Sequence, residues 1–99
     1  MDEYNKTIEE AGETLLVVDF HAPWCGPCKK ISPKLDSLVR QHNIKVLKVD
    51  TTDDEYEKVV DDLKVKYLPT FVFYKKGINL ARLEGADEIE LEKLVIDHM

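Results

Sequence analysis

The chain contains two cysteines, Cys25 and Cys28, and they stand three positions apart. A disulfide between them would close a very small loop and would restrain the unfolded chain little, so it would be a poor structural crosslink. Small secreted domains that depend on disulfides carry several cysteines at wide spacing. A lone C-x-x-C pair in an acidic domain instead favours a reducing compartment and redox chemistry at the two sulfurs.

The helix expected to begin at Cys25 gives the two thiols different roles. Cys25 falls in its first turn, where unpaired N–H groups and the helix dipole favour the thiolate, which is the reactive form of cysteine. Cys28 shares the apolar face of that helix, so we expect it to be less exposed. Cys25 is therefore predicted to attack a substrate disulfide, and Cys28 to resolve the mixed disulfide by attacking Cys25. Gly26 leaves room for another backbone, and Pro27 suits an early helical position.

Two alternatives to redox chemistry remain open, namely half of a zinc site and a pair of inert core thiols. Structural zinc sites usually have four protein ligands. The chain has no further cysteine, and His21, His42 and His98 are scattered, although His21 is near Cys25 in sequence. We therefore favour the redox interpretation and expect neither a metal nor another cofactor.

Asp19 is unusual because it interrupts an apolar run at residues 15–20, which has the composition of a strand buried on both faces. Burial without a partner raises the pKa of a carboxyl group, and such a group can exchange a proton near neutral pH. The alternative is that Asp19 ends the strand and caps the following loop.

Patterns along the rest of the chain predict the elements that position these residues. Apolar residues at helical spacing predict helices near residues 4–11, 25–41, 52–63 and 87–95. Thr52 with Glu55, and Asp87 with Glu90, read as capping boxes that open the last two. Strands are expected at residues 15–20, 44–50, 70–74 and 80–84, with a tight turn at 75–77. Strand–helix–strand alternation followed by a hairpin predicts the α/β class, with one mixed sheet and helices on both faces.

Length and charge narrow the function further. The 99 residues fit one domain, 1–99, and the formal net charge of −6 argues against a general nucleic-acid binder. No apolar run approaches the roughly 20 residues that cross a bilayer. The N-terminus begins with Met1-Asp2-Glu3 and lacks the apolar stretch of a signal peptide. We therefore expect a cytoplasmic protein with no nucleic-acid or membrane partner.

The run from Val17 to Lys29, with Trp24-Cys25-Gly26-Pro27-Cys28 inside it, resembles the active-site signature of the thioredoxin family. Further matches cover most of the chain and follow in order at Pro33, Lys48-Val49-Asp50, Leu68-Pro69-Thr70, Gly77 and Gly85-Ala86. The resemblance implies the thioredoxin fold and a protein-disulfide reductase in cellular electron transport and redox homeostasis. It also implies two kinds of partner, disulfide-containing protein substrates and an electron donor of the thioredoxin-reductase type.

The resemblance assigns roles to several further residues. It implies that Asp19 exchanges a proton with Cys28, and that Lys48 in the next strand lies near Asp19 and tunes it. For Lys48, a surface lysine with its stem along the protein is an equally good interpretation. The resemblance also implies a cis Leu68–Pro69 bond that faces the cysteines; the alternative is an ordinary trans strand start.

Trp24 reads either as a core residue or, by the resemblance, as a residue at the rim of the site. In the second case it belongs to an apolar platform for substrate chains, made of Trp24, Gly26, Pro27, Leu68, Pro69, Gly85 and Ala86. The other aromatic residues singled out, Tyr56, Tyr67, Phe71 and Phe73, are expected in or near the core.

Two departures from the family pattern stand out. His21 lies four residues before Cys25 and could weakly bias its thiolate, although such a residue more often just fills a loop. Helical spacing that begins at Tyr4 leaves no room for the short first strand that thioredoxins usually carry. We therefore expect a four-stranded sheet in which residues 44–50 form an open edge. The protein should be mostly monomeric, with weak self-association at high concentration.

Two other functions compete with the reductase. The first is an oxidant or isomerase resembling a protein disulfide isomerase domain, a class that usually has a histidine between its cysteines, where this chain has Gly26-Pro27. The second is a non-enzymatic interaction module that keeps the cysteine motif incidentally.

Overall fold

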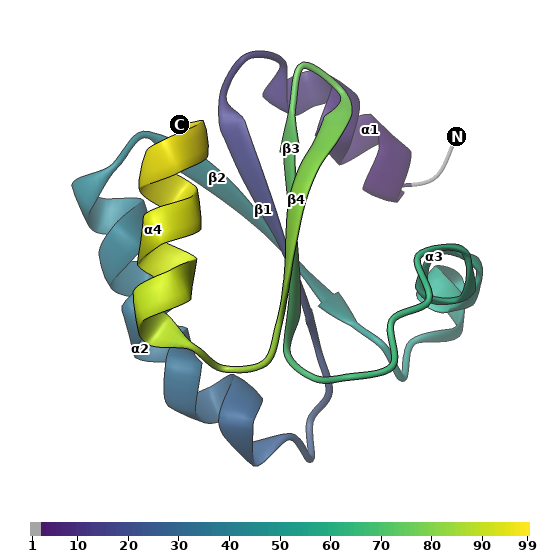
Figure 1. Ribbon diagram of the computed structural model, residues 1–99. Helices are drawn as coiled ribbons and strands as arrows, with labels where there is room; N and C mark the ends of the chain where they lie inside the picture. The colour runs from purple at the N-terminus through teal and green to yellow at the C-terminus, as the bar shows by residue number, and fades with distance from the viewer. Residues whose placement is uncertain (1–2) are drawn as a thin grey trace.

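Four strands form one mixed sheet in the order β2-β1-β3-β4 (Figure 1). The computed structural model describes residues 3–99. Strand β1 pairs in parallel with β2 and antiparallel with β3, and β3 pairs antiparallel with β4. The elements in chain order are α1 (Glu3–Ala11), β1 (Leu15–His21), α2 (Gly26–Gln41), β2 (Ile44–Asp50), the 3-10 turn η1 (Asp54–Tyr56), α3 (Glu57–Asp62), β3 (Thr70–Lys75), β4 (Ile78–Glu84) and α4 (Glu88–His98).

The alternating side chains of β1 divide the core into two layers. Leu15 and Val17 pack against α2 and α4, whereas Leu16 and Val18 pack against α1 and the segment around α3. Figure 1 shows the two pairs of helices on opposite sides of the sheet. Because both faces are covered, β1 is buried along nearly its whole length, as its continuous apolar composition predicts. The predicted α/β class and the mixed four-stranded sheet with helices on both faces are confirmed.

The N-terminal residues that the structure describes are helical from Glu3 onward and do not extend the sheet. Tyr4 fixes this helix in place, because its side chain is buried and its hydroxyl lies 2.7 Å from the hydroxyl of Tyr74 on β3. Within residues 3–99, strand β2 therefore has β1 as its single strand neighbour, and the expected open edge is confirmed for that part of the chain. Residues 1 and 2, which the expectation also concerned, lie outside the described residues.

Amide exchange is expected to reveal this open edge. The N–H of Thr51 donates to the carbonyl of His21 at 2.8 Å, so the odd-numbered residues of β2 direct their N–H groups toward β1. The N–H groups of Val46 and Lys48 then point outward, and we expect them to exchange faster than those of β1, which is paired on both sides. Equal protection of both strands would show that another segment or a second molecule covers the edge. Lys45 and Lys48 are exposed on β2 and should keep any self-association weak.

The start of α3 differs from the prediction. Thr52 does not cap it: the N–H and hydroxyl of Thr52 both donate to Oδ1 of Asp50, at 2.8 and 2.6 Å. Asp53 is instead the N-cap of the preceding 3-10 turn η1, and its carboxylate accepts from the N–H of Glu55 at 3.0 Å. Helix α3 itself begins after Tyr56, which makes no side-chain capping bond. The predicted capping box was wrong because the carboxylate at the end of β2 competes successfully for Thr52. The other predicted cap is found, since Asp87 accepts from the N–H of Glu90 at the start of α4.

Candidate active site

The two cysteines lie at the N-terminus of α2 and are joined in a disulfide, with their Cα atoms 5.3 Å apart. Cys25 is the N-cap residue, and its Sγ accepts a hydrogen bond from the N–H of Cys28 at 3.1 Å. Pro27 occupies the first turn of the helix, where the N–H it lacks would have no partner. The backbone therefore aims a donor at the sulfur of Cys25, and the helix dipole adds to it, which are the conditions that favour a thiolate.

The exposure of the two cysteines differs from the prediction. We expected Cys28 to be less exposed, but 3% of Cys25 and 8% of Cys28 are exposed. The chain turns sharply into α2, where the N–H of Cys25 donates to the carbonyl of Ala22 at 3.1 Å. Cys25 forms one buried cluster with Ala22 and Cys28, and Leu68 packs against this cluster. Exposure in the disulfide form therefore does not separate the two roles, and the assignment depends on the hydrogen bond to Cys25.

Asp19 lies on β1, which leads directly into the cysteine loop. Its side chain follows Leu15 and Val17 in the row that faces α2. Helix α2 runs in the reverse direction to β1, so its buried residues face this row in reverse order. Cys28 is the first of these buried residues and therefore lies toward the end of the row that holds Asp19. Asp19 is buried, and its Oδ1 has no hydrogen-bond partner among residues 3–99. The alternative that Asp19 ends the strand and caps a loop is wrong, because β1 continues to His21.

Burial raises the pKa of the Asp19 carboxyl above its ordinary value, and the charges of His21 and Lys48 lower it by less. Lys48 is the residue paired with Asp19 in the β1–β2 register, and its side chain is exposed. Asp19 therefore keeps a proton to higher pH than a surface carboxyl does, which is the property that proton exchange with a thiol requires. The roles of Asp19 and Lys48 in the reaction stay predictions.

The Leu68–Pro69 peptide bond is cis, as the resemblance implied. Pro69 is buried, and Leu68 packs against the cluster formed by Ala22 and the two cysteines. The N–H of Gly85 donates to the carbonyl of Pro69 at 2.8 Å, which ties the loop before β3 to the end of β4. The cysteine loop and the end of β4 are thus both joined to the loop before β3, through Leu68 and Pro69 respectively.

Around this centre, the platform residues are largely on the surface. Trp24 is 73% exposed, so the interpretation of Trp24 as a core residue is wrong. Gly26, Pro27 and Ala86 are exposed, and Leu68 and Gly85 are half-buried. Whether these residues contact substrate stays a prediction.

Sequence reasoning misplaced one aromatic residue and missed one basic residue near the site. Tyr67 was expected in or near the core but is 64% exposed, because it lies in the irregular loop before Pro69 and not on β3. Its position next to the Leu-Pro pair was the signal that could have indicated a loop. Arg82 on β4 binds the same loop, and no motif in the sequence marks it.

No cluster of three or more histidine, cysteine, aspartate or glutamate side chains in residues 3–99 is arranged to hold a metal ion. In the same part of the chain, no helix has the length and apolar character needed to cross a membrane.

Comparison with known proteins decides the family. The model of the Thioredoxin family matches residues 1–97. This chain belongs to the thioredoxin family. Thioredoxin-1 of Drosophila melanogaster is 42% identical over 97 residues, which span 96% of this chain and 89% of that protein. The thioredoxin of Mus musculus is 41% identical over 96 residues, 96% of this chain and 90% of that protein.

Solved thioredoxin structures agree with the fold. The thioredoxin of Fasciola hepatica superposes with a TM-score of 0.89 at 38% identity, covering 97% of this chain and 91% of that one. The germline-specific thioredoxin Deadhead of Drosophila gives a TM-score of 0.87 at 40% identity, with the same coverage of 97% and 91%. Proteins of the thioredoxin family are thiol–disulfide oxidoreductases, and in this chain the Cys25–Cys28 pair fits the centre of dithiol–disulfide exchange.

Proposed function

We propose that this chain is a cytoplasmic protein-disulfide reductase that serves cellular redox homeostasis. It takes two electrons from a partner of the thioredoxin-reductase type and delivers them to disulfides of other proteins. The hydrogen bond from the N–H of Cys28 to Sγ of Cys25 in the disulfide form carries this proposal, because a donor held at this position stabilises a thiolate on Cys25 once the disulfide is reduced. Gly26 and Pro27 between the cysteines add no positive charge that would stabilise it further.

The reaction proceeds through two exchange steps. The Cys25 thiolate attacks one sulfur of a substrate disulfide, forming a Cys25–substrate disulfide and releasing the other substrate sulfur as a thiolate, which takes up a proton. Cys28 then loses its proton and attacks Sγ of Cys25, which forms the Cys25–Cys28 disulfide and releases the second substrate sulfur as a thiolate that also takes up a proton. Asp19 is the group that takes the proton of Cys28 in this proposal, because it is a buried carboxyl with a raised pKa on the strand facing α2. The substrate gains two electrons and two protons, and the partner reductase restores the dithiol.

The reduction potential of the Cys25–Cys28 pair tests the direction of electron flow. We expect a reduction potential closer to that of thioredoxin, about −270 mV, than to that of protein disulfide isomerase, about −180 mV. The reason is that Gly26-Pro27 lacks the cation that stabilises the thiolate in strong oxidants. A redox titration of the purified chain against dithiothreitol or glutathione couples gives the value. A potential above roughly −210 mV would reverse the assignment from reductant to oxidant. Reduction of insulin disulfides in the presence of NADPH and a thioredoxin reductase is the matching activity assay.

A further inference from the structure

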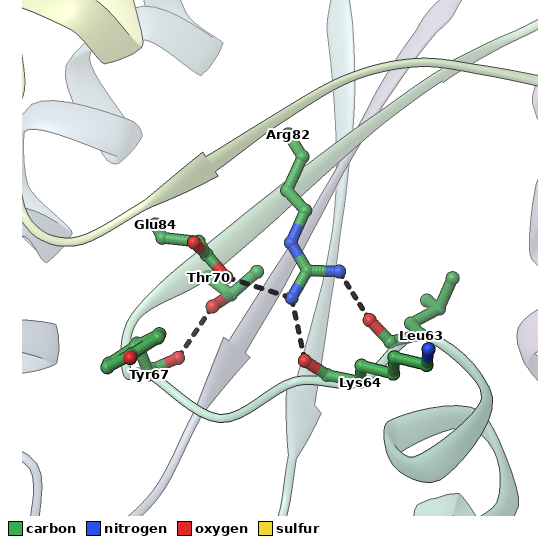
Figure 2. A network of polar contacts seen from close by, with 6 residues as sticks. All are labelled: Leu63, Lys64, Tyr67, Thr70, Arg82 and Glu84. Carbon is green, nitrogen blue, oxygen red and sulfur yellow. Dashed lines mark hydrogen bonds and ion pairs between the residues drawn. The ribbon is translucent and has the colours of Figure 1, made fainter.

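The side chain of Arg82 crosses from β4 to the segment that follows α3 (Figure 2). Its guanidinium donates to the carbonyl of Leu63, to the carbonyl of Lys64 at 2.9 Å, and to the carboxylate of Glu84 at 3.1 Å. These contacts lie at the surface of the protein, with 31% of the Arg82 side chain exposed. Three acceptors on one guanidinium fix its position, since the planar group presents its donors in a rigid fork.

The two backbone carbonyls need this donor because of how α3 ends. The N–H of Lys64 donates to the carbonyl of Asp61 at 3.1 Å, and the N–H of Val65 donates to that of Val60 at 3.0 Å, which is a Schellman ending. This pattern leaves the carbonyls of Leu63 and Lys64 without a partner in the helix. Lys64 also adopts the left-handed conformation, with φ of 52°, in which glycine would be less strained. Arg82 stabilises this ending through both carbonyls and through its charge at the negative end of the helix.

The segment held by Arg82 leads to the active site. Four residues after Lys64 comes Leu68, which packs beside Cys25 and Cys28. The far end of the segment is fixed as well, because the hydroxyl of Thr70 donates to the carbonyl of Tyr67 at 2.5 Å, a contact also drawn in Figure 2. The loop of residues 63–68 is thus anchored at one end by Arg82 and at the other by β3. Between the anchors it presents the exposed ring of Tyr67.

We propose that Arg82 is a positioning residue for substrate docking: it holds the loop of residues 63–68 so that Tyr67 and Leu68 meet a polypeptide substrate beside the disulfide. This inference rests on the proposed reductase function. Without the guanidinium, the carbonyls of Leu63 and Lys64 bind water and the left-handed Lys64 loses its support. The loop then populates other conformations, and a large substrate docks less well. The cysteines keep their own environment, because neither bonds to Arg82 or to the two carbonyls.

The variant Arg82→Met tests this, since methionine keeps an apolar stem but no donor. The matched control is Arg40→Met, which removes the same charge at an exposed site at the far end of α2 from the cysteines. For reduction of insulin, we expect Arg82→Met to raise KM about fivefold with kcat nearly unchanged, the signature of lost substrate binding. Reduction of the small disulfide 5,5′-dithiobis(2-nitrobenzoate) should be unchanged in both variants, because this molecule does not need the loop.

A second substitution separates loop geometry from general damage. Lys64→Gly in the Arg82→Met background removes the strain at the left-handed position and should return KM most of the way to that of the unmodified chain. Should Arg82→Met not fold, Arg82→Lys replaces it, because a lysine keeps the charge but not the fork, and a smaller rise in KM is then expected. Amide exchange at residues 65–68, faster in Arg82→Met than in Arg40→Met, reports the loop without any substrate.

The outcomes distinguish this proposal from the proposed function. An unmodified chain that reduces neither insulin nor the small disulfide would overturn the reductase assignment. If the unmodified chain reduces both, the positioning role is overturned by an unchanged KM in the Arg82 variant, by an equal loss on the small disulfide, or by no recovery with Lys64→Gly.

Discussion

The variant Cys28→Ser is expected to accumulate mixed disulfides with protein substrates through Cys25, whereas Cys25→Ser should trap almost none. Sγ of Cys25 accepts a hydrogen bond from the N–H of Cys28 at 3.1 Å and lies at the positive end of α2. Cys25 is therefore the thiol that ionises and attacks. Serine at position 28 leaves this attack intact and removes the resolving sulfur. Serine at position 25 removes the nucleophile and should lower turnover by at least about a thousandfold.

The measurement is a non-reducing gel, with mass spectrometry of the bands, after each variant meets a disulfide-containing protein such as insulin. The double variant Cys25→Ser/Cys28→Ser is the control for non-covalent association. Dithiothreitol should reduce the mixed disulfides and so remove every trapped band. Equal trapping by the two single variants under the same reductant would reverse the idea that the roles are distinct. The exposed fractions of 3% and 8% cannot substitute for this experiment, because both sulfurs are covered in the disulfide form.

The regular elements could be predicted from the sequence because hydrophobic periodicity follows the faces that they bury. The continuous apolar run of β1 reflects helices on both sides of the sheet, and the bounds of β2, Ile44–Asp50, were predicted to the residue. The prediction failed before α3, at the start of the turn η1, where Asp50, Thr52 and Asp53 all offer capping chemistry. Local preference could not decide among them, since the end of β2 brings the carboxylate of Asp50 to Thr52.

At the site, the sequence alone was enough to single out the two cysteines and to show that Asp19 is unusual. A thiol pair one helical turn apart and a carboxylate inside an apolar strand are visible in the sequence itself. The cis Leu68–Pro69 bond was anticipated through family resemblance, because a proline alone permits either isomer. The exposure of Tyr67 was missed because the prediction considered its aromatic side chain alone and not the loop in which it lies.

Arg82 could not have been found in the sequence, for a physical reason. Its partners are the backbone carbonyls of Leu63 and Lys64, which every residue type carries, and the left-handed turn that exposes them is formed by lysine and not by the expected glycine. The contact also joins β4 to a loop 18 positions away. Contacts of this kind follow only from the tertiary fold.

Asp19→Asn is expected to stabilise the protein at neutral pH, because asparagine carries no charge and so avoids the desolvation cost of the buried carboxylate. Burial raises the folded-state pKa of Asp19 above its ordinary 3.8. As pH rises through the window between these two values, the unfolded chain has already released a proton that the folded chain still holds. Stability therefore falls across the window and stays lower above it. Asparagine carries no charge, so the two proteins should be equally stable below the unfolded pKa and diverge above it.

Denaturant unfolding of both proteins from acid to neutral pH measures this difference, and Asp50→Asn provides a control of opposite sign. Hydrogen bonds from Thr52 lower the pKa of Asp50, so its contribution to stability is present above the unfolded pKa and is lost as pH falls. Asp50→Asn should therefore lower the free energy of unfolding at neutral pH and leave it unchanged in acid. A stability gain for Asp19→Asn that is the same at every pH would mean that its charge is not the cause.

The same Asp19 substitution should slow resolution by Cys28 while leaving the first attack by Cys25 nearly unchanged. An amide cannot take the proton of Cys28, and loss of a positioned proton acceptor typically costs on the order of a hundredfold in rate. Rapid-quench measurement of mixed-disulfide formation and release, in one turnover and across about pH 6 to 8, resolves the two steps. Unchanged release over that range would contradict the proton-transfer role. A purely structural Asp19 would change stability without changing release. A variant that is more stable and yet releases substrate more slowly indicates that the unpartnered carboxylate is retained for the reaction and not for the fold.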